Sequence, residues 1–304
     1  MKRLLSLIIT LILFSASLTT YLSYKSSVTK KAYFGDGYAI VRVFEEDGIN
    51  KAEISTMRYA AEEGSTVDVG EKGRQWLDAY SYMDTLHVSP LSTISSKGNY
   101  EAKALVLGGD FFRFHAYEVL DGYYFTDTDL HRDRVVIDEK LSFKLYGSNN
   151  SEGMPLIIGN DIYYVAGVVR VPDTKAKEIE ISDAPMIFLP EYIGEKIYGE
   201  RPFTSYEVMM EESVDSYAIT TLERASEGKT LVDVTSRYTL KSTINHLKNF
   251  TTRSYKTDKL VYPFFENHER GCEDTLAILF VVTLVTGLIF TVNLFIFITE
   301  RKRR

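Results

Sequence analysis

Cysteine is almost missing from this sequence. Cys272 is the single cysteine among 304 residues, so no disulfide can form within the chain. The fold must therefore be stabilised by its hydrophobic core, and an outward-facing protein without disulfides is typical of a bacterium. Cys272 lies close to the start of a long uncharged run with only His268 nearby, which favours an incidental thiol over a catalytic one.

Motifs of common catalytic sites are missing as well. The 304 residues contain no Gly-x-x-x-x-Gly-Lys-Ser/Thr run, so they hold no P-loop for ATP. The histidines show no pair at zinc-ligand spacing, and there is no Gly-x-Ser-x-Gly nucleophile elbow. The acidic stretch 127–133 resembles the start of a calcium loop, but Arg132 stands where that loop needs glycine, so a solvated turn is predicted. We expect no catalytic residue, cofactor or metal in this chain.

Two long runs contain no Asp, Glu, Lys or Arg: residues 4–22, which are 19 residues, and residues 275–299, which are 25. A helix rises about 1.5 Å per residue and the hydrocarbon core is about 30 Å thick, so either run can span a bilayer. The sequence predicts an N-terminal transmembrane helix in residues 1–24 and a second one in 275–299. Residues 25–274 then form an extracytoplasmic domain, and residues 300–304 form a basic tail.

Basic residues flank both runs on the side away from the central domain. Lys2 and Arg3 precede the first run, and the second is followed by Arg301, Lys302, Arg303 and Arg304. The positive-inside rule therefore predicts that both termini are cytoplasmic and that the central domain lies outside a bacterial inner membrane. A cleavable signal peptide is the alternative, because small residues at 15–17 follow a basic start and an apolar core. The apolar run continues to Leu22, which favours an uncleaved anchor.

The central domain is acidic. Its 250 residues carry 29 Lys and Arg against 41 Asp and Glu, a balance of −12. This charge argues against a nucleic-acid partner. The length is sufficient for two lobes.

Strand-like and helix-like segments alternate along the central domain. Residues 38–44 predict a buried strand, and the spacing of apolar residues in 51–63 predicts a helix. The strands predicted next are 85–95, 100–107, 135–137, 155–158, 162–171 and 186–189. Gly159-Asn160-Asp161 predicts a tight hairpin, and a strand at 205–210, a helix at 214–227 and a strand at 230–235 follow. The pattern predicts an α+β domain, an α/β lobe with a β-rich insertion at about 110–204.

Several elements within residues 108–170 recur in a fixed order. They are Asp110-Phe111-Phe112, the stretch 120–125 (LDGYYF), Val135-Val136-Ile137 before a short helix ending at Tyr146-Gly147, and the stretch 164–169 (YVAGVV). As a set, this pattern resembles the periplasmic core domain of the MacB/FtsX-like ABC transporter permeases. The resemblance implies that the α/β lobe is porter-like and that the insertion is a protruding second lobe.

The resemblance also implies partners. Family permeases work with a cytoplasmic ATPase, so ATP is expected to be bound by a partner subunit, and a second permease chain or a homodimer mate is expected beside this one. Such permeases normally continue beyond the second helix, whereas this sequence stops at Arg304. The chain is then either a half-permease completed by a separately encoded chain or an accessory or truncated form. We expect the ATPase in a separate chain, with Arg301, Lys302, Arg303 and Arg304 as candidates for coupling to it.

Small residues spaced by four in each run are candidates for helix packing. They are Thr283, Gly287 and Thr291 in the second run, and Ser15, Thr19 and Ser23 in the first. Small residues are common in membrane helices, so a chance stripe is the alternative. Residues 25–32 and 267–274 either extend the two spans outward as helical stalks or are ordinary linkers.

Three functions follow from these observations. The first is a permease subunit that couples a separate ATPase to movements of the extracytoplasmic domain, for export or envelope remodelling. The second is a membrane-anchored binding or sensor domain that does not transport. The third, an anchored enzyme, has no nameable site.

Overall fold

The computed structural model describes residues 2–32, 37–64, 76–91, 98–126, 129–211, 214–248 and 262–302. The chain forms two compact units. The sheet unit comprises residues 36–233 and 258–265, and the stalk unit comprises residues 1–35, 234–257 and 266–304.

Ten strands build the sheet unit. They are β1 (Tyr38–Ile49), β2 (Leu77–Pro90), β3 (Tyr100–Gly109), β4 (Glu118–Gly122), β5 (Arg134–Asp138), β6 (Pro155–Ile158), β7 (Asp161–Arg170), β8 (Met186–Pro190), β9 (Phe203–Glu211) and β10 (Thr230–Asp233). The order in the sheet is β10-β1-β9-β2-β3-β8-β5-β7-β4, and β6 pairs with both β2 and β7. Because β6 bridges these two strands, β2, β3, β8, β5, β7 and β6 form a closed ring, from which β9, β1 and β10 extend as an open wing.

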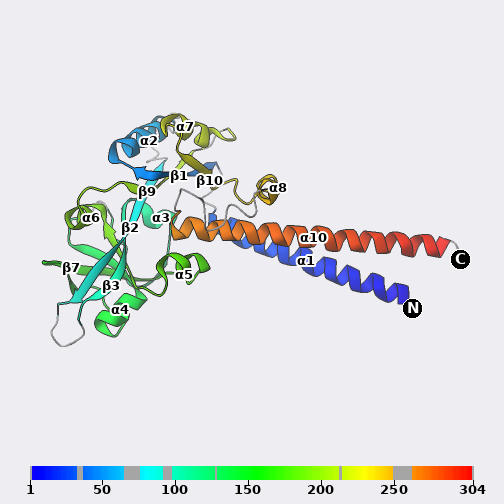
Figure 1. Cartoon of the computed structure of the whole chain (residues 1–304), viewed down its shortest axis with the longest axis horizontal. Coiled ribbons are helices and arrows are strands. Elements are labelled where there is room, and N and C mark those ends of the chain that lie inside the picture. Colours follow the sequence, from blue (N-terminus) through cyan, green and yellow to red (C-terminus); the bar gives the residue numbers. More distant parts are fainter. Residues whose placement is uncertain are drawn as a thin grey trace. The chain divides into compact units, whose positions relative to one another are not determined.

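Helices cover this sheet. They are α2 (Lys51–Gly64), α3 (Phe111–Phe114), α4 (Glu139–Tyr146), α5 (Lys175–Ile181), α6 (Glu191–Tyr198) and α7 (Tyr217–Ala225). Helices α2 and α7 lie side by side over the wing (Figure 1) and bury Met57 and Leu222 against it. Helix α2 begins with a capping box, in which Asn50 and Glu53 each accept a hydrogen bond from the backbone N–H of the other.

Most of the predicted elements are present. The hairpin joins β6 to β7 through Gly159 and Asn160, and Gly159 takes a φ of +63°, which the first position of a type II′ turn requires. The short helix before Tyr146-Gly147 is α4, which ends at Gly147 with φ +73°. The mixed α/β fold class is confirmed. The predicted insertion at 110–204 supplies β4 to β8, and the earlier strands β2 and β3 complete the ring.

Two strands are longer than predicted. Strand β2 begins at Leu77 rather than at residue 85, although the added residues 77–84 include Asp78 and Asp84. Each of these carboxylates is paired with an arginine, Arg58 and Arg201 respectively, so the strand can enter the core. Strand β1 continues past the acidic residues 45–47 to Ile49 through a register shift opposite β9.

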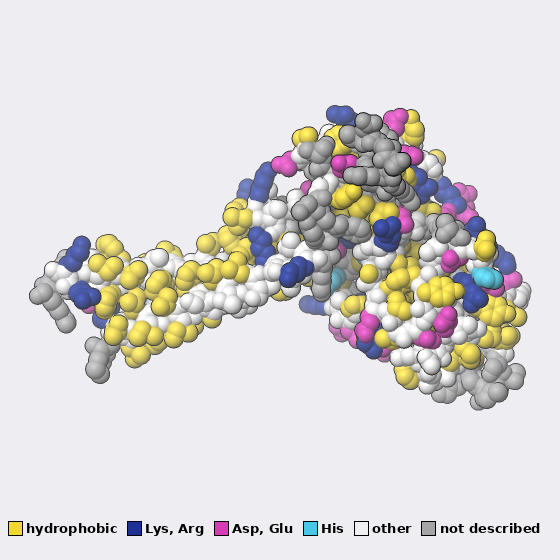
Figure 2. All heavy atoms as spheres, turned by 180° about the vertical axis from the view of Figure 1, so that it is seen from behind, with side chains coloured by type: hydrophobic (Ala, Val, Ile, Leu, Met, Phe, Trp, Pro, Cys, Tyr) yellow, Lys and Arg dark blue, Asp and Glu magenta, His cyan; other side chains and the backbone are white. Residues whose placement is uncertain are grey.

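Within the described residues, the stalk unit contains the long helices α1 (Lys2–Ala32) and α10 (Phe264–Lys302) and the short helix α8 (Leu240–Lys248). Helices α1 and α10 are long and apolar enough to cross a membrane, and few of the residues in their most apolar stretches are buried. Figure 2 shows hydrophobic side chains along the face of these helices that is in view. The predicted stalks at 25–32 and 267–274 are helical continuations of the two spans, as the long-helix interpretation expects.

Candidate functional site

Helices α1 and α10 pack against each other in antiparallel register. Arg3 pairs with Glu300 at 3.2 Å near one end of the pair. Further along, Phe14 stacks on Phe290 with ring centroids 6.1 Å apart, and Tyr21 contacts Phe280 at 5.8 Å. The first residues of α1 and the last of α10 therefore lie at the same end of the pair.

The predicted small-residue positions occupy different places in this pair. Thr283 donates to the backbone oxygen of Ser17 at 3.3 Å, and a Cβ added to Gly287 would meet the ring of Phe14 at 3.0 Å. Both lie where α10 faces α1.

Ser15, Thr19 and Thr291 are exposed, and the hydroxyls of Thr19 and Thr291 donate to the backbone of their own helix. Ser17 contacts α10 instead, because two residues turn a helix by about 200° and place Ser15 on the opposite side. Packing of the exposed positions against another chain stays a prediction.

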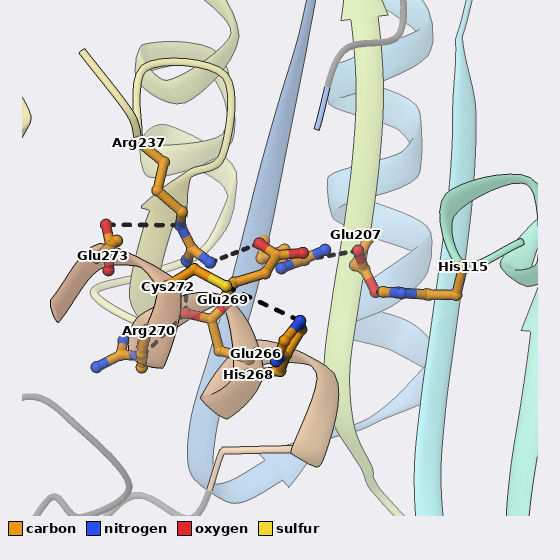
Figure 3. A network of polar contacts seen from close by, with 10 residues as sticks. His115, Glu207, Arg237, Glu266, His268, Glu269, Arg270, Cys272 and Glu273 are labelled. Atoms are coloured by element: carbon orange, nitrogen blue, oxygen red, sulfur yellow. Dashed lines mark hydrogen bonds and ion pairs between the residues drawn. The ribbon is translucent and has the colours of Figure 1, made fainter. Parts of the chain in front are cut away.

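A buried arginine joins the segment after β10 to α10. Arg237 is 2% exposed. Its guanidinium donates to Glu266 and to Glu269 at 2.5 Å each, and Glu273 lies 3.7 Å from its Nε (Figure 3). The three glutamates are spaced by three and four residues, so they lie on one face of α10.

A second set of contacts surrounds this arginine. Arg270 donates to Glu266 at 2.9 Å, so that buried carboxylate is shared between two guanidinium groups. His246 on α8 is buried and pairs with Asp274 of α10. We call Arg237 and His246, with Glu266, Glu269, Glu273 and Asp274, the stalk clamp.

Apolar packing reinforces the clamp. Tyr238 packs in one cluster with Tyr21 and Val28 of α1 and with Leu276 of α10. Its burial raises the pKa of its hydroxyl, which therefore stays neutral. Cys272 lies at the edge of this cluster, half-buried, with its Sγ 3.9 Å from His268. The segment after β10 is thus attached to both long helices just before the uncharged run of α10 begins.

The first two residues of α10, Phe264 and Phe265, belong to the sheet unit and pack among aromatic side chains, which we call the aromatic socket. The ring centroid of Phe265 lies 4.2 Å from that of His115 and 6.1 Å from that of Phe111. The guanidinium of Arg42 lies 5.5 Å from the centroid of the Phe265 ring. Phe264 and Phe265 are both buried in the core that contains Phe111 and Phe188. Helix α10 therefore has anchoring contacts in the sheet unit at its start and in the stalk unit along its next turns.

A buried cluster of charged side chains lies next to this socket. Arg42 and Glu207 are direct partners on β1 and β9, and the Arg42 Nε donates to Glu207 at 2.7 Å. His115 Nε2 lies 2.5 Å from the other carboxylate oxygen. Burial alone would raise the pKa of Glu207, but the charges of Arg42 and His115 outweigh it and lower this pKa to about 2. The carboxylate stays ionised at neutral pH.

A cleft of about 520 Å³ opens elsewhere on the sheet unit. One wall is aromatic, with Trp76, Phe112 and Tyr124. Arg58, Asp78, Asp110 and Arg113 provide charges of both signs, and the 2.6 Å pair of Arg58 with Asp78 fixes two of them. Gly109 forms the corner beside them with φ +68°, where a Cβ would lie 2.3 Å from the Asp78 carbonyl oxygen.

The remaining predicted positions are placed as follows. Arg301 and Lys302 are exposed at the end of α10, and Arg303 and Arg304 lie outside the described residues. Asp129 accepts hydrogen bonds from the backbone and hydroxyl of Thr126, and residues 127 and 128 of the predicted acidic turn lie outside the described residues. Among the residues that the structure describes, no group of three or more His, Cys, Asp or Glu could hold a metal ion.

Sequence reasoning missed the stalk clamp and the aromatic socket. The sequence does contain one signal for the clamp. Acidic residues recur on one helix face in the turns before the uncharged run, and such a face is suited to a basic partner. Arg237 stands 29 residues from Glu266, and no local pattern connects the two. His115 and His246 do act in polar contacts, but each pairs with a carboxylate remote in sequence.

Comparisons with known proteins agree on one family. Residues 5–240 match the model of the MacB-like periplasmic core domain. The macrolide export ATP-binding/permease protein MacB of Chromobacterium violaceum is 25% identical over 236 residues, which are 75% of this chain and 33% of that protein. The chain thus spans about a third of the length of this curated relative.

Two solved structures are similar at a lower level. The periplasmic region of MacB from Actinobacillus actinomycetemcomitans is 15% identical with a TM-score of 0.46, over 69% of this chain and 94% of that one. The extracellular domain of the noncanonic ABC-type transporter YknZ from Gram-positive bacteria is 15% identical with a TM-score of 0.42, over 64% of this chain and 98% of that one.

Proposed function

Because this chain belongs to the family of the MacB-like periplasmic core domain, we propose that it is a permease subunit that couples a separate cytoplasmic ATPase to movements of its extracytoplasmic domain. Both termini are cytoplasmic, and α1 and α10 cross the membrane. A second permease chain or a second copy completes the complex, and the movement serves export or envelope remodelling.

Helix α10 is the observation that carries this proposal. It runs without interruption from Phe264 to Lys302, so the same helix contains the socket residues, the clamp glutamates and the uncharged run. A continuous helix can transmit a displacement along its axis because each turn is hydrogen-bonded to the next. The pairing of Arg3 with Glu300 supports a common side for the two basic ends.

The clamp connects a displacement of α10 to the rest of the extracytoplasmic domain. Glu266, Glu269 and Glu273 move with α10, and Arg237 follows them because a buried guanidinium that loses its carboxylates would be left uncompensated. Arg237 stands shortly after β10, which pairs with β1 at the edge of the wing. A shift of α10 would thereby act on the wing as well as on the socket.

ATP must be bound elsewhere, since these 304 residues contain no P-loop. The test is purification of the full chain from its native membrane in mild detergent, followed by identification of the proteins that accompany it. We expect an ATPase, and we expect its recovery to fall several-fold when the basic end is neutralised by Arg301→Gln, Lys302→Gln, Arg303→Gln and Arg304→Gln.

A matched control neutralises four exposed basic residues of the sheet unit: Lys144→Gln, Lys175→Gln, Lys196→Gln and Arg224→Gln. These changes should leave the recovery of the ATPase unaltered. Recovery of the chain without any ATPase or second membrane protein would overturn the proposal.

The cleft on the sheet unit favours a second candidate, a binding or sensor domain that does not transport. Its aromatic wall and paired charges suit a peptide or cell-wall fragment. Trp76 is the single tryptophan of the chain and lines this cleft, so its fluorescence reports binding directly. Saturable quenching by such a ligand, with no accompanying ATPase in the purified material, would favour this candidate.

A further inference from the structure

Helix α8 exposes an apolar stripe. Leu240 is 49% exposed and Ile244 is 45% exposed. The two residues are four apart, so they lie about 40° from each other around the helix, and Leu247 lies about 20° from Leu240 on its other side. Three large apolar side chains thus share one face of a nine-residue helix.

The other side of α8 is attached to α10. Thr243 and His246 are its buried residues, and His246 pairs with Asp274. This contact fixes the level of α8 along α10, because Asp274 is the last charged residue before the uncharged run 275–299. On α10, the next exposed apolar side chains are Ile278, Val281 and Val282, which follow within the run.

Two lysines flank the apolar stripe. Lys241 and Lys248 are exposed, and seven residues of helix bring them to within about 20° of each other, beside Ile244. An apolar face with lysines at its border is the pattern of helices that lie in a membrane interface. Lysines that lie near an anionic membrane surface are attracted to it.

We propose that α8 is an interfacial helix that lies in the outer leaflet, with Leu240, Ile244 and Leu247 in the lipid and Lys241 and Lys248 on the phosphates of anionic phospholipids. The proposal rests on the proposed topology, in which α10 crosses the membrane. The apolar side chains of α8 reach about 5–10 Å into the boundary between headgroups and acyl chains. Since Arg237 and His246 bind the same helix α10, the clamp is held at the membrane surface.

The test places a fluorophore on the full chain in vesicles that contain a lipid-attached quencher. In a Cys272→Ser background, a single cysteine is introduced by Ile244→Cys, by Asn245→Cys on the neighbouring exposed side, or by Val282→Cys in the uncharged run. We expect lipid quenching at residue 244 to approach that at 282 and to exceed that at 245 several-fold. In vesicles of phosphatidylglycerol, Lys241→Gln with Lys248→Gln should reduce the quenching at 244, whereas in phosphatidylcholine it should change little.

Equal quenching at residues 244 and 245, with strong quenching at 282, would overturn the interfacial helix and leave the spanning of α10 intact. A label at 244 that is shielded from both the lipid quencher and aqueous iodide would also overturn it, because a protein partner would then cover the stripe. Loss of quenching at 282 as well would overturn the topology on which the proposed function depends.

Discussion

Arg42 and Arg237 are both buried and both bound by glutamate, yet they connect different kinds of elements. Arg42 faces Glu207 across two adjacent strands of one sheet, and the strand register itself holds the pair together. Arg237 reaches from the segment after β10 to carboxylates on α10, a separate helix. The first pair lies within one sheet, whereas the second connects a loop segment to the helix that moves in the proposed function. Burial alone therefore does not distinguish a structural ion pair from a coupling contact.

Removing Arg42 should have the largest effect. Arg42→Met leaves Glu207 buried with only His115 beside it, so we expect the sheet unit to lose about 3–5 kcal/mol of stability. Thermal unfolding of the full chain in detergent measures this loss. The double variant Arg42→Met with Glu207→Leu should recover part of the stability, because the buried carboxylate that lost its arginine is removed as well. A double variant as unstable as the single one would contradict the account.

Acid should weaken the same pair. The pKa of Glu207 is about 2 in the fold and lies near 4.5 without its partners, so its stabilisation is complete above about pH 4.5 and is lost as the pH falls toward 2. The loss is on the order of 3 kcal/mol. Chemical denaturation at several pH values measures it, and Glu207→Gln should flatten the slope in this window. An unchanged slope in that variant would assign the acid sensitivity to other carboxylates.

Breaking the clamp should act locally. Arg237→Met removes the guanidinium that Glu269 and Glu273 face and leaves Glu266 with Arg270 alone. We therefore expect hydrogen exchange in the segment of Arg237 and in α8 to become faster, because the free energy of local opening falls by about 2–3 kcal/mol. Exchange in β1 and β9 should remain slow. Lys196→Met, which breaks an exposed pair with Asp161, is the control and should alter neither region. Fast exchange throughout the sheet unit would show that Arg237 serves folding as Arg42 does.

The smallest effect is expected between the two long helices. Gly287→Val would place a side chain where the ring of Phe14 lies only 3.0 Å from an ideal Cβ. Helices α1 and α10 must then separate slightly, which should weaken their packing by about 1 kcal/mol. Thr291→Val, on an exposed position of the same helix, is the matched control. Disulfide trapping between cysteines placed in α1 and α10 would detect the separation.

Local signals in the sequence were sufficient for the elements that depend on local physics. The charge-free runs, the turn at Gly159 and the helix end at Gly147 each follow from hydropathy or from backbone preference at one place in the chain. The start of β2 was missed because Asp78 and Asp84 look unsuited to a buried strand until Arg58 and Arg201 are brought to them. Arg237 and His246 were missed for the same reason, since their partners are supplied by the fold rather than by neighbouring residues.

The central claim is that the clamp moves when the partner ATPase works, and Cys272 is a native reporter of it. This half-buried thiol lies beside Tyr238 and is the single cysteine of the chain, so a maleimide labels one position. The measurement is the rate of labelling in the purified complex with its ATPase, without nucleotide, with a non-hydrolysable ATP analogue and with ADP plus vanadate. The account predicts rates that differ several-fold between these states in the native chain and converge in Arg237→Met. Equal rates in all three states, in a complex that hydrolyses ATP, would contradict it.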